Sequence, residues 1–175
     1  MTLAEHRDRS PRQASVWIAT LSDTRTQQTD TGGATVSALV QEAGHHVVGR
    51  SLLREDSRTL AFELRNILSK PELDVLICTG GTGIAPRDIA FEQLQSLYER
   101  SIPGFGELFR MLSWEEIGSA ALLSRASAGI CGKVVIFSVP GSPAAIDLAM
   151  HKLILPELMH LLGELDRAEP PGELL

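Results

Sequence analysis

The sequence predicts a three-layer α/β/α fold built around a mostly parallel sheet. Residues 75–79 and 134–139 are short, continuously apolar runs, and such runs are typical of parallel strands buried on both faces. Between the strand-like runs, apolar residues recur at i, i+3, i+4 and i+7, the spacing of one face of a helix. Strands that alternate with helices indicate βαβ units, whose helices cover both faces of the sheet.

The first half of the chain predicts five elements in order: a strand at 16–21, a helix at 36–43, a strand at 46–53, a helix at 60–68 and a strand at 75–79. Gly44 stands where a helix C-cap belongs, because glycine reaches the left-handed conformation without a steric penalty. Asp56 or Ser57 is the candidate N-cap of the second helix, and Pro71 lies just beyond its end. The polar stretch 22–33 is expected to be a loop.

The second half predicts a short helix at 91–97, a helix at 105–112, a strand at 134–139 and a long helix from Pro143. Segment 124–130 fits a strand or a loop, and the sequence leaves the two open. Ser142 is the expected N-cap of the last helix, with Pro143 at its first position. Pro156 lacks the amide that a helix interior requires, so it should kink that helix or end its first part.

Length and composition indicate one cytoplasmic domain with short flanking segments. The chain has 175 residues, of which 43% are hydrophobic, and this suits a single core. We expect a flexible arm over 1–14, a domain over 15–162 and a flexible tail over 163–175. No targeting signal opens the chain, and no apolar run reaches the ~20 residues of a membrane span. The net charge of −6 argues against binding to nucleic acids.

The strongest local signal is the segment Thr79-Gly80-Gly81-Thr82-Gly83, which directly follows the third strand. Its glycines let the backbone turn sharply, and successive amides in such a turn form a nest that binds anions such as phosphate. A tight structural turn is the alternative interpretation. The segment is neither a Walker A loop nor a dinucleotide-binding fingerprint, because neither the lysine nor the G-x-G-x-x-G spacing is present.

Acidic residues stand in the loops that follow the first three strands. Asp88 comes after the glycines, and Glu55-Asp56 follows the second strand at the same edge of the sheet. A carboxylate beside a phosphate needs a cation between them, and Mg²⁺ prefers such oxygen ligands. The alternatives are a helix N-cap for Asp88 and compensation of a helix dipole for Glu55 and Asp56. Asp23 and Asp30 flank the first loop, either as turn formers or as direct contributors to a site.

Two segments that combine proline and glycine open predicted helices. Residues 140–143 offer the free amides of a helix N-terminus to an anion, and loop closure with capping is the alternative. Residues 103–107 form an unusual entry into the helix at 105–112. The apolar stripe of that helix predicts a core contact or a subunit interface; it consists of Phe105, Leu108, Phe109 and Leu112.

Four motifs stand in order along the chain: Thr79-Gly80-Gly81-Thr82-Gly83 with Asp88, then Pro103-Gly104-Phe105-Gly106-Glu107, then Ser124-Arg125, and then Pro140-Gly141-Ser142-Pro143. Their order and spacing resemble the MoaB/Mog family of molybdenum-cofactor biosynthesis proteins. The resemblance spans about residues 15–162. Stretches 42–48 and 109–118 are more similar to the MoaB branch than to Mog.

The resemblance implies a molybdopterin-binding-like fold and the adenylylation of molybdopterin. In the family, the terminal phosphate of molybdopterin attacks the α-phosphorus of ATP, Mg²⁺ offsets charge, and pyrophosphate leaves. It implies catalytic roles for Asp88, Glu55 and Asp56, with Mg²⁺ held transiently by Asp88 and Glu55. The family usually has Asp at the position of Glu55. The residues that it implies for molybdopterin and phosphate binding are Thr79, Gly80, Gly81, Thr82, Gly83, Gly104, Gly106, Glu107, Ser124, Pro140, Gly141 and Ser142.

The resemblance also implies partners: ATP and molybdopterin as substrates, other molybdenum-cofactor biosynthesis proteins, and copies of the same chain in a homotrimer or homohexamer. Two alternatives stay open. A non-catalytic MoaB-type paralogue would bind molybdopterin or a partner protein without transferring AMP. Nucleotide-pyrophosphatase domains that resemble the competence-damage family share the fold, but their loop is usually of the Thr-Gly-Gly-Leu-Gly-Pro type, where this chain has Thr82-Gly83-Ile84.

Overall fold

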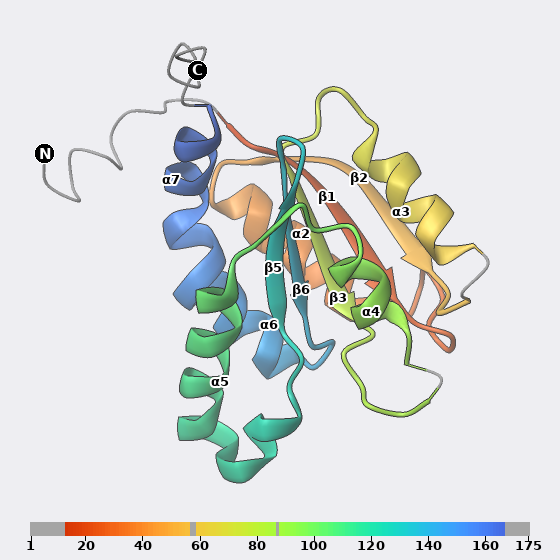
Figure 1. Cartoon of the computed structure of the whole chain (residues 1–175), viewed down its shortest axis with the longest axis vertical. Helices are drawn as coiled ribbons and strands as arrows, with labels where there is room; N and C mark the ends of the chain where they lie inside the picture. Colours follow the sequence, from red (N-terminus) through yellow and green to blue (C-terminus); the bar gives the residue numbers. More distant parts are fainter. Residues whose placement is uncertain (1–12, 57–58, 87, 167–175) are drawn as a thin grey trace, which may run out of the picture.

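A six-stranded sheet forms the centre of the computed structural model, which describes residues 13–56, 59–86 and 88–166 (Figure 1). The strands lie in the order β2-β1-β3-β6-β5-β4. Their bounds are β1 Ser15–Leu21, β2 His46–Leu53, β3 Val75–Gly80, β4 Arg100–Ser101, β5 Ser127–Cys131 and β6 Val134–Val139. The predicted strands of the first half and the strand at 134–139 are confirmed.

Four neighbouring strands are parallel, and one edge of the sheet is antiparallel. β2, β1, β3 and β6 run in one direction, whereas β5 pairs antiparallel with β6 and β4 with β5. The segment that the sequence left open as strand or loop becomes β5. It forms a hairpin with β6 through Gly132, whose φ of 58° suits a tight hairpin turn. The mostly parallel sheet is therefore confirmed.

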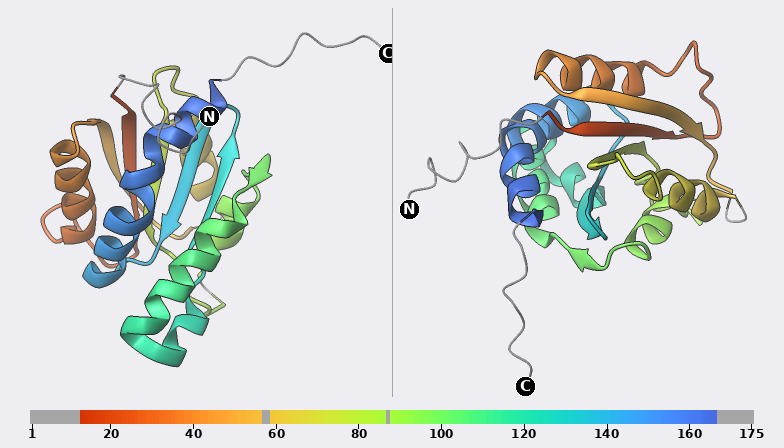
Figure 2. Two further views of the ribbon diagram at one scale, coloured as in Figure 1. Left: turned by 90° about the vertical axis from the view of Figure 1, so that its left-hand side faces the viewer. Right: turned by 90° about the horizontal axis from the view of Figure 1, so that it is seen from above.

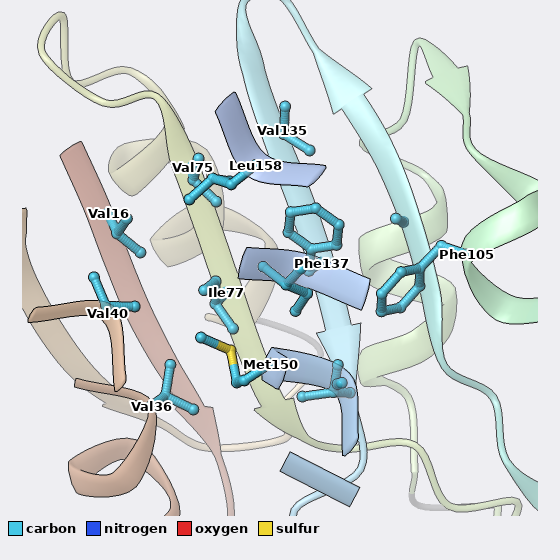
Figure 3. Close-up of a cluster of buried hydrophobic side chains, with 14 of the residues drawn as sticks. Val16, Val36, Val40, Val75, Ile77, Phe105, Val135, Phe137, Met150 and Leu158 are labelled. Atoms are coloured by element: carbon cyan, nitrogen blue, oxygen red, sulfur yellow. The ribbon is translucent and has the colours of Figure 1, made fainter. Parts of the chain in front are cut away.

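Helices cover both faces of the sheet, as predicted (Figures 1 and 2). Their bounds are α2 Thr31–Glu42, α3 Leu60–Leu68, α4 Ala90–Gln95, α5 Pro103–Ile117, α6 Pro143–Ala149 and α7 Leu155–Leu165. On one face α2, α5, α6 and α7 share a core with the sheet, in which the rings of Phe105 and Phe137 lie 5.2 Å apart (Figure 3). On the other face α3 and α4 contribute Leu64 and Leu94 to a second core. None of the described helices is long and apolar enough to cross a membrane.

The apolar residues of α5 divide between two faces of the helix. Phe105 and Phe109 are buried in the core, so the core interpretation of their stripe is confirmed, whereas Leu108 is exposed. A second stripe, which the sequence analysis did not single out, is exposed and includes Leu108, Met111, Trp114 and Ile117. With Leu122 and Leu123 of the following 3₁₀ turn η1 (Gly118–Leu123), it forms what we call the α5 apolar face. In Figure 1 the end of α5 and η1 project beyond the sheet.

Helix α2 begins at Thr31, before the predicted start at 36, because Asp30 caps it. The Asp30 carboxylate accepts a hydrogen bond from the amide of Gly33 at 2.9 Å. This bond satisfies one of the amides that a helix start leaves unpaired. At the other end Gly44 has a φ of 83°, as the predicted C-cap glycine requires.

Two other N-cap expectations are wrong. Thr59, not Asp56, occupies the N-cap position of α3, and it makes no side-chain capping bond. The other candidate, Ser57, lies outside the described residues. Ile89, not Asp88, stands at the N-cap of α4. Asp88 directly precedes the N-cap Ile89, and the backbone carbonyl of Asp56 accepts from the amides of Thr59 and Leu60, so sequence spacing missed each cap by a few positions.

Pro156 ends the first part of the C-terminal helix, as predicted. A π-helical turn, η2 (Met150–Ile154), separates α6 from α7, and the amide of Leu155 bonds to the carbonyl of Met150. Pro156 then lies in the first turn of α7, where its missing amide leaves no bond unmade. α7 continues to Leu165, past 162, and Ala14 is buried. Most of the predicted arm and tail lies outside the described residues, so the domain limits stay a prediction.

The topology brings three strand ends together. β1 ends at Leu21, β3 at Gly80 and β6 at Val139, and these parallel strands point the same way. From β1 the chain continues through α2 to β2 on one side, whereas β6 lies on the far side of β3. β1 and β3 therefore flank the switch point of the sheet, outside which ligands bind in open α/β folds.

Candidate functional site

A small pocket, which we call the switch-point pocket, opens where β1 and β3 end. It has a volume of about 130 Å³ and is lined by Thr20, Leu21, Ser22, Arg25, Asp30, Gly32, Thr79, Gly80 and Gly141. The side chain of Thr79 is 1% exposed, and its hydroxyl oxygen has no hydrogen-bond partner. A buried hydroxyl without a partner costs stability, and a ligand in the pocket would supply the partner.

Two glycines keep the switch-point pocket open. A Cβ atom would lie 3.8 Å from the Thr79 hydroxyl oxygen if added to Gly32, and 3.9 Å if added to Gly141. Gly32 belongs to the first turn of α2, a helix of 12 residues whose start carries the positive end of the helix dipole. The amides of Thr31, Gly33 and Ala34 are already hydrogen-bonded there. The pocket therefore offers a small anion the Thr79 hydroxyl and the positive end of the helix dipole.

The predicted glycine turn contributes its first two residues, Thr79 and Gly80, to the lining of this pocket, whereas Gly81, Thr82 and Gly83 do not line it. Gly80 and Gly81 have φ values of 91° and 65°, which side chains rarely adopt. A Cβ on Gly80 would clash with the carbonyl oxygen of Leu21, and one on Gly81 with the side chain of Ala90. The segment is a tight structural turn that brings β1, β3 and the start of α4 into close contact. The anion nest that the sequence suggests for this segment stays a prediction.

Three carboxylates meet beside the glycine turn: those of Glu55, Asp88 and Asp23. Burial raises the pKa of Glu55, and the charges of Asp88 and Asp23 raise it further, while the backbone amides of Ala90 and Ile89 lower it. The Oε2 atom of Glu55 is buried and has no hydrogen-bond partner. A half-buried carboxylate with like charges nearby and one buried, unpartnered oxygen would be stabilised by a divalent cation.

Glu55 and Asp56 have different surroundings. Glu55 is half-buried and interacts with Asp88, and its amide donates to Oδ1 of Asp23 at 3.1 Å. Asp56 is exposed, and its backbone carbonyl accepts bonds from the first amides of the turn into α3. Of the two residues that the sequence offers as partners for Asp88, the geometry favours Glu55.

Asp30 is both a helix cap and a wall of the switch-point pocket. It is 8% exposed. One carboxylate oxygen accepts from the Thr20 hydroxyl at 3.0 Å and from the Gly33 amide, and the other accepts from the guanidinium of Arg50 at 2.8 Å. Asp30 therefore contributes to the pocket wall with both of its oxygens bonded.

A larger cleft of about 550 Å³ lies between α4, the start of α5 and β5. Of the residues that the family resemblance implies, Gly106, Glu107 and Ser124 line this cleft, and Gly104 does not. Packing also explains why residue 106 is glycine, because a Cβ there would lie 2.6 Å from the carbonyl oxygen of Ala126. The predicted site residues thus divide between the larger cleft and the switch-point pocket.

The predicted segment 140–143 contributes mainly through one residue. Gly141 lines the switch-point pocket, whereas Pro140 and Ser142 do not. The Ser142 hydroxyl accepts a hydrogen bond from the amide of Ala145 at 3.3 Å and caps α6. The capping interpretation is therefore confirmed for Ser142.

Arg125 connects the larger cleft to the glycine turn. Its guanidinium lines the cleft and lies 4.5 Å from the ring centre of Phe91. It donates to the carbonyl oxygens of Thr82, Gly83 and Asp88 and to the carboxylate of Glu92. Arg125 therefore fixes the shape of the loop that carries Asp88.

The residues of these two cavities that were not among the candidates from the sequence include Arg25, Gly32, Arg110 and Arg125. The only signal in the sequence was the place of Arg125 in the Ser124-Arg125 motif. The other three stand in segments whose neighbours across the fold the sequence does not show.

Comparisons with known proteins agree with this geometry. A family model described as "Probable molybdopterin binding domain" matches residues 17–160. Molybdenum cofactor biosynthesis protein B of Bacillus cereus is 45% identical over 168 residues, which cover 95% of this chain and 99% of the relative. The Bacillus subtilis protein of the same name is 41% identical, with 94% and 98% covered. The chain belongs to the MoaB family.

Solved structures of the MoaB family have the same fold. A crystal structure of molybdenum cofactor biosynthesis protein B matches with a TM-score of 0.85 and 45% identity, covering 89% of this chain and 98% of that one. The tungsten cofactor synthesizing protein MoaB from Pyrococcus furiosus matches with a TM-score of 0.80 and 32% identity, covering 90% and 100%. The sequence-based recognition of the family and its molybdopterin-binding fold are confirmed.

We predict that Arg125→Met loosens the glycine turn without unfolding the protein. Amide hydrogen exchange of residues 81–86 should accelerate about tenfold or more, because the carbonyl oxygens of Thr82 and Gly83 lose their donor. Arg65→Met, which changes an exposed arginine on α3, is the control and should leave exchange in the turn unchanged. Equal exchange in both variants would show that the turn holds its shape without Arg125.

Proposed function

We propose that this MoaB-family protein adenylylates molybdopterin with ATP in a reaction that depends on Mg²⁺. The observation that carries the proposal is the pair of Glu55 and Asp88, with a buried, unpartnered oxygen on Glu55. The pair lies beside the glycine turn, whose first two residues, Thr79 and Gly80, line the switch-point pocket. Phosphate binding and charge neutralisation thus come together at one sheet edge, and nucleotidyl transfer needs little else from a protein.

The residues present fit Mg²⁺ as a cation shared with the substrate. No group of three or more His, Cys, Asp or Glu residues in the described ranges could hold a metal ion on its own. Mg²⁺ is usually held by one or two carboxylates together with substrate phosphates and water. Glu55 and Asp88 would hold the ion in this way, and the unpartnered oxygen of Glu55 would gain its partner. When bound, the ion would offset negative charge on the triphosphate.

The proposed reaction exchanges one phosphoanhydride bond for another. An oxygen of the terminal phosphate of molybdopterin forms a bond to the α-phosphorus of ATP. The bond from that phosphorus to the oxygen that bridges to the β-phosphorus breaks, and pyrophosphate leaves with the electron pair. The protein contributes by positioning: the switch-point pocket and the glycine turn hold phosphate oxygens through Thr79 and backbone amides. The larger cleft, with Arg110 and Glu107 on its wall, has the volume for a ring system.

We propose that this chain acts as an assembly of identical copies, as the family resemblance implies. The α5 apolar face is exposed over 47% of Leu108, 56% of Met111, 62% of Trp114 and 82% of Leu122. Contiguous apolar surface of this kind marks an interaction site. A homotrimer or homohexamer would cover it, and other molybdenum-cofactor biosynthesis proteins are the proposed further partners.

Substitutions of the carboxylates test the reaction. Asp88→Asn should keep molybdopterin affinity and lose on the order of 10² or more in AMP transfer, because a charge that stabilises the transition state is removed. Glu55→Gln should behave alike, whereas Asp56→Asn, on the exposed neighbour, is the matched control and should be nearly silent. The measurement is AMP transfer with molybdopterin, ATP and Mg²⁺, beside binding of molybdopterin. Binding without any transfer by the wild type would favour the non-catalytic alternative.

The Thr79 hydroxyl offers a second test, because its roles in stability and in binding have opposite signs. Thr79→Val removes a buried, unpartnered hydroxyl and should raise the free energy of unfolding by roughly 1 kcal/mol. It should also weaken phosphate and ATP binding several-fold. Ser138→Ala is the matched control, since its hydroxyl is also buried and unpartnered but does not line the pocket. It should leave binding unchanged. Equal binding by both variants would remove Thr79 from the site.

The α5 apolar face is tested by charge. Trp114→Glu should shift the protein toward a single chain in light scattering, because a charge buried in an interface is costly. Phe62→Glu changes an aromatic side chain on α3 that is 71% exposed and should leave the assembly intact. A wild-type protein that scatters as one chain at micromolar concentration would contradict the assembly proposal.

A further inference from the structure

The switch-point pocket would bring two negatively charged groups close together. A pocket proposed to hold a phosphate group has a buried carboxylate, that of Asp30, in its wall. At short range a carboxylate repels a phosphate unless its charge is offset. Phosphate binding in this pocket therefore requires a positive charge that offsets the carboxylate of Asp30.

We propose that Arg50 determines the anion preference of the switch-point pocket by neutralising Asp30 from behind its wall. This inference rests on the proposed function, because it assumes that the pocket receives a phosphate group. Arg50 lies in β2 and does not line the pocket. Its Nη2 atom lies 2.8 Å from the Oδ2 atom of Asp30. It acts on the ligand through Asp30 and is a positioning residue, not a catalytic one.

Asp30 separates two cavities, and Arg50 reaches it from the second one. That cavity has a volume of about 240 Å³ and is lined by Gln27, Asp30, Arg50, Ser51 and Leu52. Arg50 is 38% exposed on this side, whereas Asp30 is 8% exposed. The arginine therefore keeps part of its hydration while the carboxylate is desolvated, so the pair forms without burying both charges fully.

The hydrogen bonds of Asp30 leave no carboxylate oxygen directed at a ligand. Oδ1 accepts from the Thr20 hydroxyl and the Gly33 amide, and Oδ2 accepts from Arg50. The two charged residues that line the switch-point pocket are Arg25 and Asp30, and their charges cancel. Arg50 adds the positive charge that makes the local balance favour an anion.

The pyrophosphate affinities of two single variants and of the double variant distinguish this role from a merely structural one. Arg50→Met should weaken the binding of inorganic pyrophosphate by about tenfold or more, because the carboxylate of Asp30 becomes uncompensated. Asp30→Asn should bind pyrophosphate as tightly as the wild type or more tightly, since asparagine caps a helix as well as aspartate does. The double variant should return to near wild-type affinity. Binding is measured by calorimetry on the full chain at constant ionic strength, with Arg65→Met as the control for net charge.

Each possible set of affinities supports or contradicts a specific hypothesis. If Arg50 only holds the start of α2 in place, Asp30→Asn should lose affinity as Arg50→Met does, and the double variant should stay weak; that result overturns the inference. If Arg50→Met fails to fold, the affinity of Asp30→Asn alone decides between the two roles. If the wild type binds neither pyrophosphate nor ATP, the proposed function fails as well. If the wild type binds and Arg50→Met binds equally, only the inference fails.

Discussion

The close approach of two backbones at the switch point sets the geometry of the whole site. Leu21 of β1 and Gly80 of β3 are paired at the ends of their strands, and the carbonyl oxygen of Leu21 fills the space where a side chain of residue 80 would lie. This contact makes Gly80 necessary and starts the turn that continues to Asp88. The start of α4, the larger cleft and the position of Asp88 all follow from the direction that the chain takes there.

Two arginines, Arg50 and Arg125, pair with acidic side chains around the site. Arg50 offsets Asp30 behind the switch-point pocket, and Arg125 holds carbonyl oxygens and Glu92 beside the glycine turn. Burial and the nearby charge of Asp88 raise the pKa of Glu55. In an acidic protein with a net charge of −6, the proposed binding of phosphate would depend on local arrangement and not on the overall charge.

The fold could be predicted from the sequence because its signals are local, whereas parts of the site depend on contacts across the fold. Apolar runs and helical spacing located β1, β2, β3, β6 and most helices, and glycine chemistry located the turn. The segment of β5 was left open between strand and loop, and the two-residue β4 was not predicted. The sequence could not show that Asp30 begins α2, because its cap depends on Thr20 and Arg50 from two different strands. Nor could it show that Glu55 lies near Asp88 while Asp56 is exposed, since that difference depends on a contact between two separate loops. No motif or spacing in the sequence indicated that Arg25 and Gly32 line the site.

The site also contains most of the polar atoms that the fold leaves unsatisfied. In the described part of the chain, three buried side-chain atoms lack a hydrogen-bond partner: Glu55 Oε2, Thr79 Oγ1 and Ser138 Oγ. Each such atom costs about 1–3 kcal/mol. Two of the three lie where a cation and an anion are proposed to bind, and packing alone gives no reason to keep them. Local rules of folding are broken most often at functional sites, and here the broken rules fall on the residues that would contact the two charged parts of one substrate complex.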